Sequence, residues 1–238
     1  MNLERYYDTY WQVKDEGLDP ERIQFVLDKV SSSDRVLDLG CGPGKMTAEI
    51  HQKCPDVIGL DFSEVVLAKA RARGVQTVKA DLDDGGLPFD SQSFDAVVFT
   101  QTIEHLFNFK RSLVESSRVL REGGKLILSV PNIAHWRFRL ALLCGRFPYI
   151  EDTQTHSQHI RFFTVKDTKA LCRDAGFRVE ELRGTSALDW CPLYHWRMNT
   201  TPFRQVYELA TRLYPSLFAF YVTFVCRKTH EPVAERKD

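Results

Sequence analysis

The segment Arg35-Val-Leu-Asp-Leu-Gly-Cys-Gly-Pro-Gly44 decides the fold. Its first five residues form a short, nearly continuous apolar run, which is typical of a buried strand. Three closely spaced glycines follow, and residues 46–53 then show the apolar spacing of a helix. Glycines in such a turn let the backbone approach a ligand, and the free N–H groups at the start of the helix attract an anionic group. The segment therefore predicts a ligand-binding strand–turn–helix unit.

The same alternation of strands and helices continues along the rest of the chain. We expect further strands at residues 57–61, 76–80, 94–100, 124–130, 177–182 and 217–227. We expect further helices at residues 20–30, 65–70, 113–120, 165–175 and 203–213. Because helical segments rather than hairpins connect the strands, the sequence predicts an α/β fold with a parallel sheet and helices on both faces.

Length and composition exclude several classes of protein. The chain has 238 residues, with 32 Lys and Arg against 32 Asp and Glu, so the zero net charge argues against a dedicated nucleic-acid-binding protein. The longest apolar run, residues 217–226, is shorter than a membrane-spanning helix. The first residues lack the apolar core of a signal peptide, and the six cysteines form no C-x-x-C pair. We therefore expect a cytoplasmic protein with free thiols.

The chain is expected to form a single domain with three kinds of segment. They are an N-terminal helical entry (1–33), a cofactor-binding core (35–130) and two irregular insertions on the substrate side, over the active-site edge of the sheet (132–163 and 187–215). In the entry, Tyr6, Tyr10 and Trp11 could form a lid over the cofactor or pack onto the domain.

Acidic residues follow two of the predicted strands. Asp61 ends the strand after the glycine turn, 21 residues beyond Gly40, where its carboxylate could accept two hydrogen bonds from a ribose diol. Asp81 follows the next strand, where it could accept from the amino group of adenine. A dinucleotide fingerprint would have Gly or Ala at position 45, and Lys45 therefore argues against NAD or FAD.

This order of motifs, with the segment 87–95 leading into the fourth strand, resembles the class I S-adenosylmethionine-dependent methyltransferases. The resemblance implies a Rossmann-like seven-stranded sheet, six strands parallel and the last, 217–227, antiparallel. It also implies S-adenosylmethionine as cofactor and S-adenosylhomocysteine as product. By the same resemblance, the methionine portion is held by Asp38, Gly40, Cys41, Gly42 and Gly44, the ribose by Asp61, and the adenine by Phe62, Asp81 and Leu82, with Gln101 also beside the cofactor.

Three segments indicate where in the class the chain falls. Pro131-Asn-Ile-Ala-His-Trp-Arg-Phe-Arg139, followed by Leu142-Leu-Cys-Gly-Arg146, is similar to the W-type proteins of methionine biosynthesis (MetW-like). Residues 155–164 are similar to bacterial methyltransferases linked to polysaccharide or natural-product pathways. Ile103-Glu-His-Leu106 is closer to the ubiquinone-biosynthesis O-methyltransferases.

The residues after the fourth strand are the candidates for chemistry. Methyl transfer from a sulfonium requires alignment, exclusion of water and removal of the acceptor's proton, which a hydroxyl acceptor needs most. Glu104 and His105 fall at the carboxyl edge of the sheet, where a ligand binds, and His105 is our candidate general base because the reference pKa of histidine is about 6.5. We expect O-methylation of a small molecule. N-methylation, for example of an amino sugar, and a cofactor-binding partner protein without catalysis stay open as alternatives.

A metal site is the remaining alternative. Some O-methyltransferases that act on quinone precursors or on RNA carry E-x-x-E-H after this strand and a distant histidine, which together bind a divalent metal. Here the tract reads Gln101-Thr-Ile-Glu-His105, and the amide in place of a carboxylate weakens such a site. We therefore expect no metal, with Gln101, Glu104, His105 and His159 as the alternative ligand set. Four arginines of the first insertion would suit an acidic acceptor or serve as surface ion-pair partners: Arg137, Arg139, Arg146 and Arg161.

Overall fold

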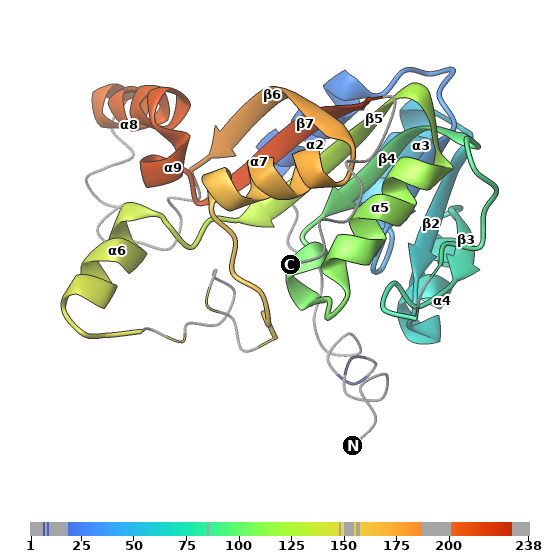
Figure 1. The fold of residues 1–238 in the computed structure, drawn as a ribbon. Coiled ribbons are helices and arrows are strands. Elements are labelled where there is room, and N and C mark those ends of the chain that lie inside the picture. The colour runs from blue at the N-terminus through green and yellow to red at the C-terminus, as the bar shows by residue number, and fades with distance from the viewer. Residues whose placement is uncertain are drawn as a thin grey trace.

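The structure is a computed structural model, and it describes residues 7, 9, 19–84, 86–147, 149, 155, 158–186 and 201–229 (Figure 1). In the described part of the chain seven strands form one sheet in the order β3-β2-β1-β4-β5-β7-β6. The strands are β1 (Val36–Leu39), β2 (Val57–Asp61), β3 (Gln76–Lys79), β4 (Phe94–Thr100), β5 (Leu120–Pro131), β6 (Phe177–Thr185) and β7 (Tyr221–Lys228).

The strand directions agree with the expected fold class. The four pairs among β1 to β5 are parallel, whereas β7 is antiparallel to both of its neighbours, β5 and β6. Because β7 lies between β5 and β6, strand β6 runs in the same direction as β5. The prediction of six parallel strands and an antiparallel last strand is therefore confirmed.

Helices cover both faces of the sheet (Figure 1). The described helical elements are α2 (Pro20–Lys29), α3 (Lys45–Lys53), α4 (Glu64–Ala72), the single 3-10 turn η1 (Ile103–His105), α5 (Phe109–Val119), α6 (Trp136–Leu143), α7 (Val165–Asp174), α8 (Thr201–Leu213) and α9 (Pro215–Phe218). Helices α2 and α3 bury apolar side chains such as Val26 and Ile50 against one face. Helices α5 and α7 bury Leu113 and Cys172 against the other face.

Polar caps explain where several helices begin. The Ser63 hydroxyl accepts a hydrogen bond from the backbone N–H of Val66 at 3.4 Å and so caps α4. The Asp19 carboxylate accepts from the backbone N–H of Glu21 at 3.0 Å, and Pro20 occupies the first turn of α2, where no N–H partner is needed. Gly176, with φ of 83°, follows the end of α7.

Leu217 and Leu120 were each assigned to the wrong kind of element. Leu217 was expected in the last strand, but it belongs to α9, and β7 begins only at Tyr221. The backbone N–H groups of Leu217 and Phe218 donate to the carbonyl of Tyr214, so this part of the apolar run is helical. An apolar run by itself does not distinguish a strand from a buried helix. Leu120 was expected at the end of a helix, but it starts β5.

Helices α6 and α8, which belong to the described parts of the two insertions, lie beyond the same end of the sheet (Figure 1). Helix α6 belongs to the first insertion and α8 to the second, whose residues 187–200 lie outside the described part of the chain. The five cysteines that the structure describes are free, as predicted. Among the described helices, none combines the length and the apolarity that are needed to cross a membrane.

Candidate functional site

The glycine turn after β1 adopts a backbone that only glycine accommodates well. Gly40, Gly42 and Gly44 have φ of 67°, 52° and 77°, in the left-handed region. A Cβ at Gly40 would lie 2.2 Å from Cγ2 of Thr102, and one at Gly44 would lie 2.6 Å from the Cβ of Ala70. The turn is therefore pressed between α4 and the loop that follows β4, and it presents backbone rather than side chains to a ligand.

Asp61 holds this turn from the end of β2. Its Oδ2 accepts from the backbone N–H of Gly42 and its Oδ1 from the backbone N–H of Ser63, both at 3.0 Å. A carboxylate oxygen can accept more than one hydrogen bond, so these contacts are compatible with a diol ligand. The assignment of Asp61 to the ribose stays a prediction, and the structure adds a role in positioning the glycine turn.

Two other residues of the predicted cofactor set direct their side chains into the protein. Asp38 is 2% exposed, and its Oδ2 accepts from the hydroxyl of Thr47 at 2.6 Å, which joins β1 to the first turn of α3. Cys41 is 4% exposed, and its Sγ packs against Gly59 on β2. A Cβ added at Gly59 would be only 2.8 Å from this sulfur. Close packing on β2 thus explains Cys41, and a contact between its side chain and a cofactor has no support in this geometry.

The turn after β3 carries the residues predicted for adenine. Asp81 is exposed, and its Oδ1 accepts from the backbone N–H of Asp83 at 2.8 Å. The carbonyl of Leu82 accepts from the hydroxyl of Ser112 at 3.0 Å. Side chain and backbone of this turn are thereby fixed next to α5.

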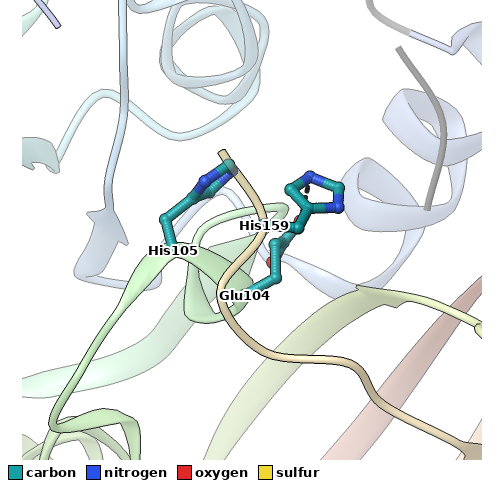
Figure 2. Close-up of side chains that lie close together, drawn as sticks. All are labelled: Glu104, His105 and His159. Carbon is teal, nitrogen blue, oxygen red and sulfur yellow. Dashed lines mark ion pairs between the residues drawn. The ribbon is translucent and has the colours of Figure 1, made fainter. Parts of the chain in front are cut away.

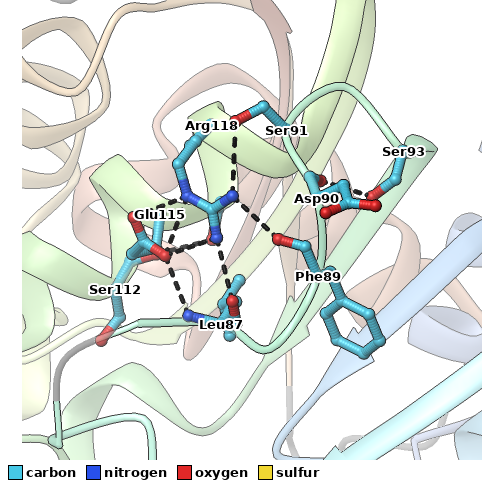
Figure 3. A network of polar contacts seen from close by, with 9 residues as sticks. Leu87, Phe89, Asp90, Ser91, Ser93, Ser112, Glu115 and Arg118 are labelled. Carbon is cyan, nitrogen blue, oxygen red and sulfur yellow. Dashed lines mark hydrogen bonds and ion pairs between the residues drawn. The ribbon is translucent and has the colours of Figure 1, made fainter.

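A half-buried ion pair fixes the far end of the same loop (Figure 3). Arg118 on α5 binds the Glu115 carboxylate at 2.8 Å and donates to the carbonyls of Leu87 and Phe89. The hydrogen bonds from the Arg118 guanidinium hold the pKa of Glu115 below its usual value. This network stabilises the segment that leads into β4.

One aromatic residue that the sequence reasoning missed lies over the site. The ring of Tyr7 makes an edge-to-face contact with Phe62 at 5.1 Å between centroids, and another with His105 at 6.2 Å. The entry segment therefore reaches the loops after β2 and β4. The predicted lid residues Tyr6, Tyr10 and Trp11 lie outside the described residues.

Three side chains converge after β4 (Figure 2). Glu104 and His105 belong to η1 and His159 to the first insertion, and one ligand atom from each lies within 4.8 Å of the others. The backbone N–H groups of Ile160 and Arg161 donate to the carbonyl of Glu104 at 3.0 and 3.1 Å. These two hydrogen bonds hold the insertion against η1 and bring His159 to the site.

The hydrogen bond of His105 defines its tautomer. Its Nδ1 lies 3.1 Å from the backbone carbonyl oxygen of Gln158. A carbonyl only accepts, so Nδ1 donates, and the lone pair of the neutral imidazole is on Nε2. Nε2 is therefore the atom that can accept a proton or bind a metal.

Glu104 is buried without a hydrogen bond to its carboxylate oxygens from any described residue. Burial raises its pKa to about 8, and the opposing charge of Arg22 does not offset this effect. The Nε2 of His159 is 4.0 Å from Oε1, which is longer than a hydrogen bond. In the absence of a cation, Glu104 is therefore protonated in most molecules at neutral pH.

The alternative metal set is only partly assembled. Glu104, His105 and His159 converge, and imidazole with carboxylate suits a divalent transition metal. The side-chain nitrogen of Gln101 instead donates to the hydroxyl of Ser129 on β5 at 3.3 Å. His156, the other downstream histidine, lies outside the described residues.

Two of the four arginines that we considered for an acidic acceptor bind the protein's own backbone. Arg139 donates to the carbonyls of Ala134 and Ser216, and Arg161 donates to that of Phe107. These guanidinium groups connect the first insertion to its neighbours. Because these two arginines have a structural role, fewer arginines of the first insertion remain as candidates for binding an acidic acceptor.

His135 has the structural role that its position next to Trp136 suggests. Its Nδ1 accepts from the backbone N–H of Arg137 at the start of α6, and its Nε2 lies 3.1 Å from the hydroxyl of Tyr207 on α8. Burial lowers the pKa of His135 to about 4, so the ring is neutral. It caps α6 and joins the two insertions.

A second residue was missed by the sequence reasoning. Arg22 on α2 is 6% exposed, and its guanidinium lies 5.5 Å from the centre of the Tyr221 ring. The available signal was its spacing, because Arg22 is three and four positions before the buried Phe25 and Val26. An arginine on the apolar face of a helix predicts a buried positive charge.

Comparison with known proteins gives a family and a fold. Residues 21–209 match the family model described as methionine biosynthesis protein MetW. A Mycolicibacterium smegmatis protein named "Probable S-adenosylmethionine-dependent methyltransferase" is 36% identical over 152 residues, which cover 63% of this chain and 54% of that protein. A ubiquinone biosynthesis O-methyltransferase of Nitrosococcus oceani is 24% identical over 196 residues, which cover 76% and 79%. The chain spans about half the length of the first curated relatives that it matches.

The fold has counterparts among solved structures. The complex between the Haloferax volcanii Trm112 methyltransferase activator and its methyltransferase aligns with a TM-score of 0.62 at 22% identity, over 87% of this chain and 88% of the other. At this identity the likeness concerns the fold alone. The Rossmann-like fold that the sequence motifs implied is thereby confirmed.

Proposed function

We propose that this chain, which belongs to the family of the methionine biosynthesis protein MetW, transfers a methyl group from S-adenosylmethionine to a hydroxyl group of a small molecule. Two observations support methyl transfer: the names of the curated relatives and the glycine turn at the carboxyl edge of β1. The insertions 132–163 and 187–215 would form the wall of the acceptor site, because they follow strands at that edge.

The described residues fit the cofactor. Positive φ angles at Gly40, Gly42 and Gly44 open a backbone cradle that a Cβ would fill, and Asp61 offers carboxylate oxygens next to it. Phe62 supplies an aromatic face on the adenine side. When bound, S-adenosylmethionine supplies an electrophilic methyl group with a neutral thioether as leaving group.

The observation that carries O-methylation is the hydrogen bond between Nδ1 of His105 and the carbonyl of Gln158. It leaves Nε2 as the acceptor atom of a neutral imidazole at the edge where the methyl acceptor would lie. In our proposal the hydroxyl proton passes to Nε2 as the acceptor oxygen forms its bond to the methyl carbon. An amine acceptor would need this service less, because a neutral amine is a stronger nucleophile than a neutral hydroxyl and can attack before it loses a proton.

The test is a panel of small hydroxyl and amine compounds with release of S-adenosylhomocysteine as the readout. We expect turnover with hydroxyl compounds, rising with pH as His105 becomes neutral. Turnover with amines alone would favour the N-methylation alternative. Cofactor binding without turnover across the panel would favour a partner protein without catalysis, an alternative that the Trm112 complex of a structural neighbour keeps in view.

We propose that the reaction needs no metal. The second candidate is metal-assisted methylation, and the convergence of Glu104, His105 and His159 is the observation that favours it. A divalent cation there would polarise the acceptor oxygen in place of a base. Exhaustive chelation followed by dialysis distinguishes the two. We expect turnover to survive chelation. Loss of turnover that Mg²⁺, Mn²⁺ or Zn²⁺ restores would show that the metal-free proposal is wrong.

A further inference from the structure

Arg22 is a buried cation with no ion-pair partner among the described residues. Its side chain lies on the face of α2 that packs on the sheet, and the whole residue is 6% exposed. The guanidinium makes no hydrogen bond and no ion pair with any described residue, and its Nε is fully buried. The guanidinium carbon lies 5.5 Å from the centre of the Tyr221 ring. A cation–π contact of this length does not neutralise the charge.

Burying the charge of Arg22 costs free energy as long as no anion is bound next to it. A guanidinium stays protonated in proteins, so it cannot escape burial by losing its proton. Buried charges are normally paired, because removing them from water costs several kcal/mol that an opposite charge must offset. The adjacent Glu21 does not fulfil this role, since its carboxylate pairs with Arg204 on α8. Glu104 feels the charge of Arg22 but forms no ion pair with it, so no described carboxylate lies within ion-pair distance of the guanidinium.

The position of Arg22 indicates what would supply the anion. Tyr221 is the first residue of β7 and pairs with Pro131, the last residue of β5. This pair lies at the carboxyl edge of the parallel strands, where ligands of such sheets bind. The charge of Arg22 also acts on Glu104, which follows β4 at the same edge. Arg22 thus faces the acceptor side of the site.

We propose that Arg22 binds an anionic group, a carboxylate or a phosphate, of the methyl acceptor. The inference rests on the proposed methyl transfer and narrows its substrate class from small molecules in general to acidic ones. The planar guanidinium offers paired N–H donors that match either group, and the buried surroundings strengthen the contact. Arg139 and Arg161 are less suited, because each guanidinium already donates to at least one backbone carbonyl.

The test measures binding of inorganic phosphate and of malonate to the full chain loaded with S-adenosylhomocysteine, at constant ionic strength. Wild type, Arg22→Gln and Arg22→Lys are compared. The matched control is Arg178→Gln, which removes the same charge from an exposed side chain on β6 that pairs with Glu180. We expect wild type and the control to bind at least one of the two anions with equal affinity, and Arg22→Gln to bind it roughly 10- to 100-fold more weakly. Arg22→Lys should fall between, since it keeps the charge without the paired donors.

Thermal unfolding without added anion separates binding from a structural role. If Arg22 awaits a ligand, Arg22→Gln unfolds at the same or a higher temperature than wild type. A clear drop in the unfolding temperature of Arg22→Gln, absent in Arg178→Gln, would identify a structural residue and overturn the proposal. The proposal would also be overturned if Arg22→Gln bound the anion with wild-type affinity, or if the wild-type protein bound neither anion. Phosphate and malonate show which anionic group is preferred. Calorimetry with S-adenosylhomocysteine reports separately on the proposed function, and we expect equal cofactor affinity in wild type and Arg22→Gln.

Discussion

Nδ1 of His105 lies 3.1 Å from the backbone carbonyl oxygen of Gln158. This contact joins the loop after β4 to the first insertion across 53 positions of the chain. It orients the imidazole, fixes the position of its lone pair and anchors the segment that carries His159. A candidate base and one wall of the acceptor site are therefore held by the same hydrogen bond.

Replacing the candidate base should slow turnover without weakening cofactor binding. Removal of a positioned base costs about 10²- to 10⁴-fold in rate, and we expect this loss in kcat of His105→Gln. The pH–rate profile should also lose its acidic limb. Calorimetry should give nearly unchanged affinity for S-adenosylhomocysteine. If turnover of the variant equals that of wild type at every pH, His105 does not take the proton.

Loss of the Asp61 carboxylate should weaken cofactor binding. Asp61→Ala removes the predicted diol contact and also the acceptors for the N–H groups of Gly42 and Ser63. We expect a loss of about 1–3 kcal/mol in the binding of S-adenosylmethionine. Asp90→Ala, an exposed site, is the control. Equal affinity in wild type and Asp61→Ala would place the cofactor elsewhere.

The pKa of Glu104 predicts how stability depends on pH. This pKa is raised to about 8 in the folded chain from an ordinary value near 4.5. Between these values the native state keeps a proton that the unfolded chain releases, so the free energy of unfolding falls as pH rises. Glu104→Gln removes the titration. In chelated protein we expect the variant to gain stability relative to wild type from pH 5 to pH 8, by up to a few kcal/mol.

Denaturant unfolding at several pH values provides the measurement. Glu122→Gln, an exposed carboxylate, serves as the control and should show no such gain. A difference between Glu104→Gln and wild type that stays constant with pH would mean that the buried carboxyl is ionised in the folded chain. A bound cation would have that effect, so the same experiment repeated with added metal tests the alternative site.

The glycine turn offers a matched pair of substitutions. Gly44 and Gly74 have similar φ, 77° and 82°, but a Cβ at Gly44 would meet the Cβ of Ala70 at 2.6 Å, whereas one at Gly74 would meet nothing within 4 Å. Gly74→Ala should cost about 1 kcal/mol of stability from backbone strain alone. Gly44→Ala should cost about 1–3 kcal/mol more because of the clash. Chemical denaturation measures both, and equal losses would contradict the close packing of α3 on α4.

Local signals in the sequence were sufficient for most of the fold. The strand β2 and the cap at Ser63 follow from apolar periodicity and capping chemistry, which depend on neighbouring residues. Leu217 was misassigned because the same apolar run suits a helix or a strand, and the choice is made by its hydrogen bonds to Tyr214. Length, spacing and caps cannot report a choice of this kind.

The site was harder to predict than the fold, since its members come from distant segments. Glu104 and His105 were identified from their position after β4, and the convergence of His159 depends on how the insertion packs on η1. Arg22 escaped notice because its burial is a tertiary property, although its place on the apolar stripe of α2 was readable. Tyr7 reaches Phe62 and His105 only through the path of the entry segment.

The hydrogen bonds from Ile160 and Arg161 to the carbonyl of Glu104 have a consequence for engineering and for divergence among relatives. A graft that exchanges the first insertion would replace the wall of the acceptor site. It would also replace the backbone carbonyl of Gln158, whose hydrogen bond to Nδ1 makes Nε2 the proton-accepting nitrogen of His105. Changes of substrate preference and of pH optimum should therefore be inherited together. A chimera that keeps residues 158–161 native would separate the two traits.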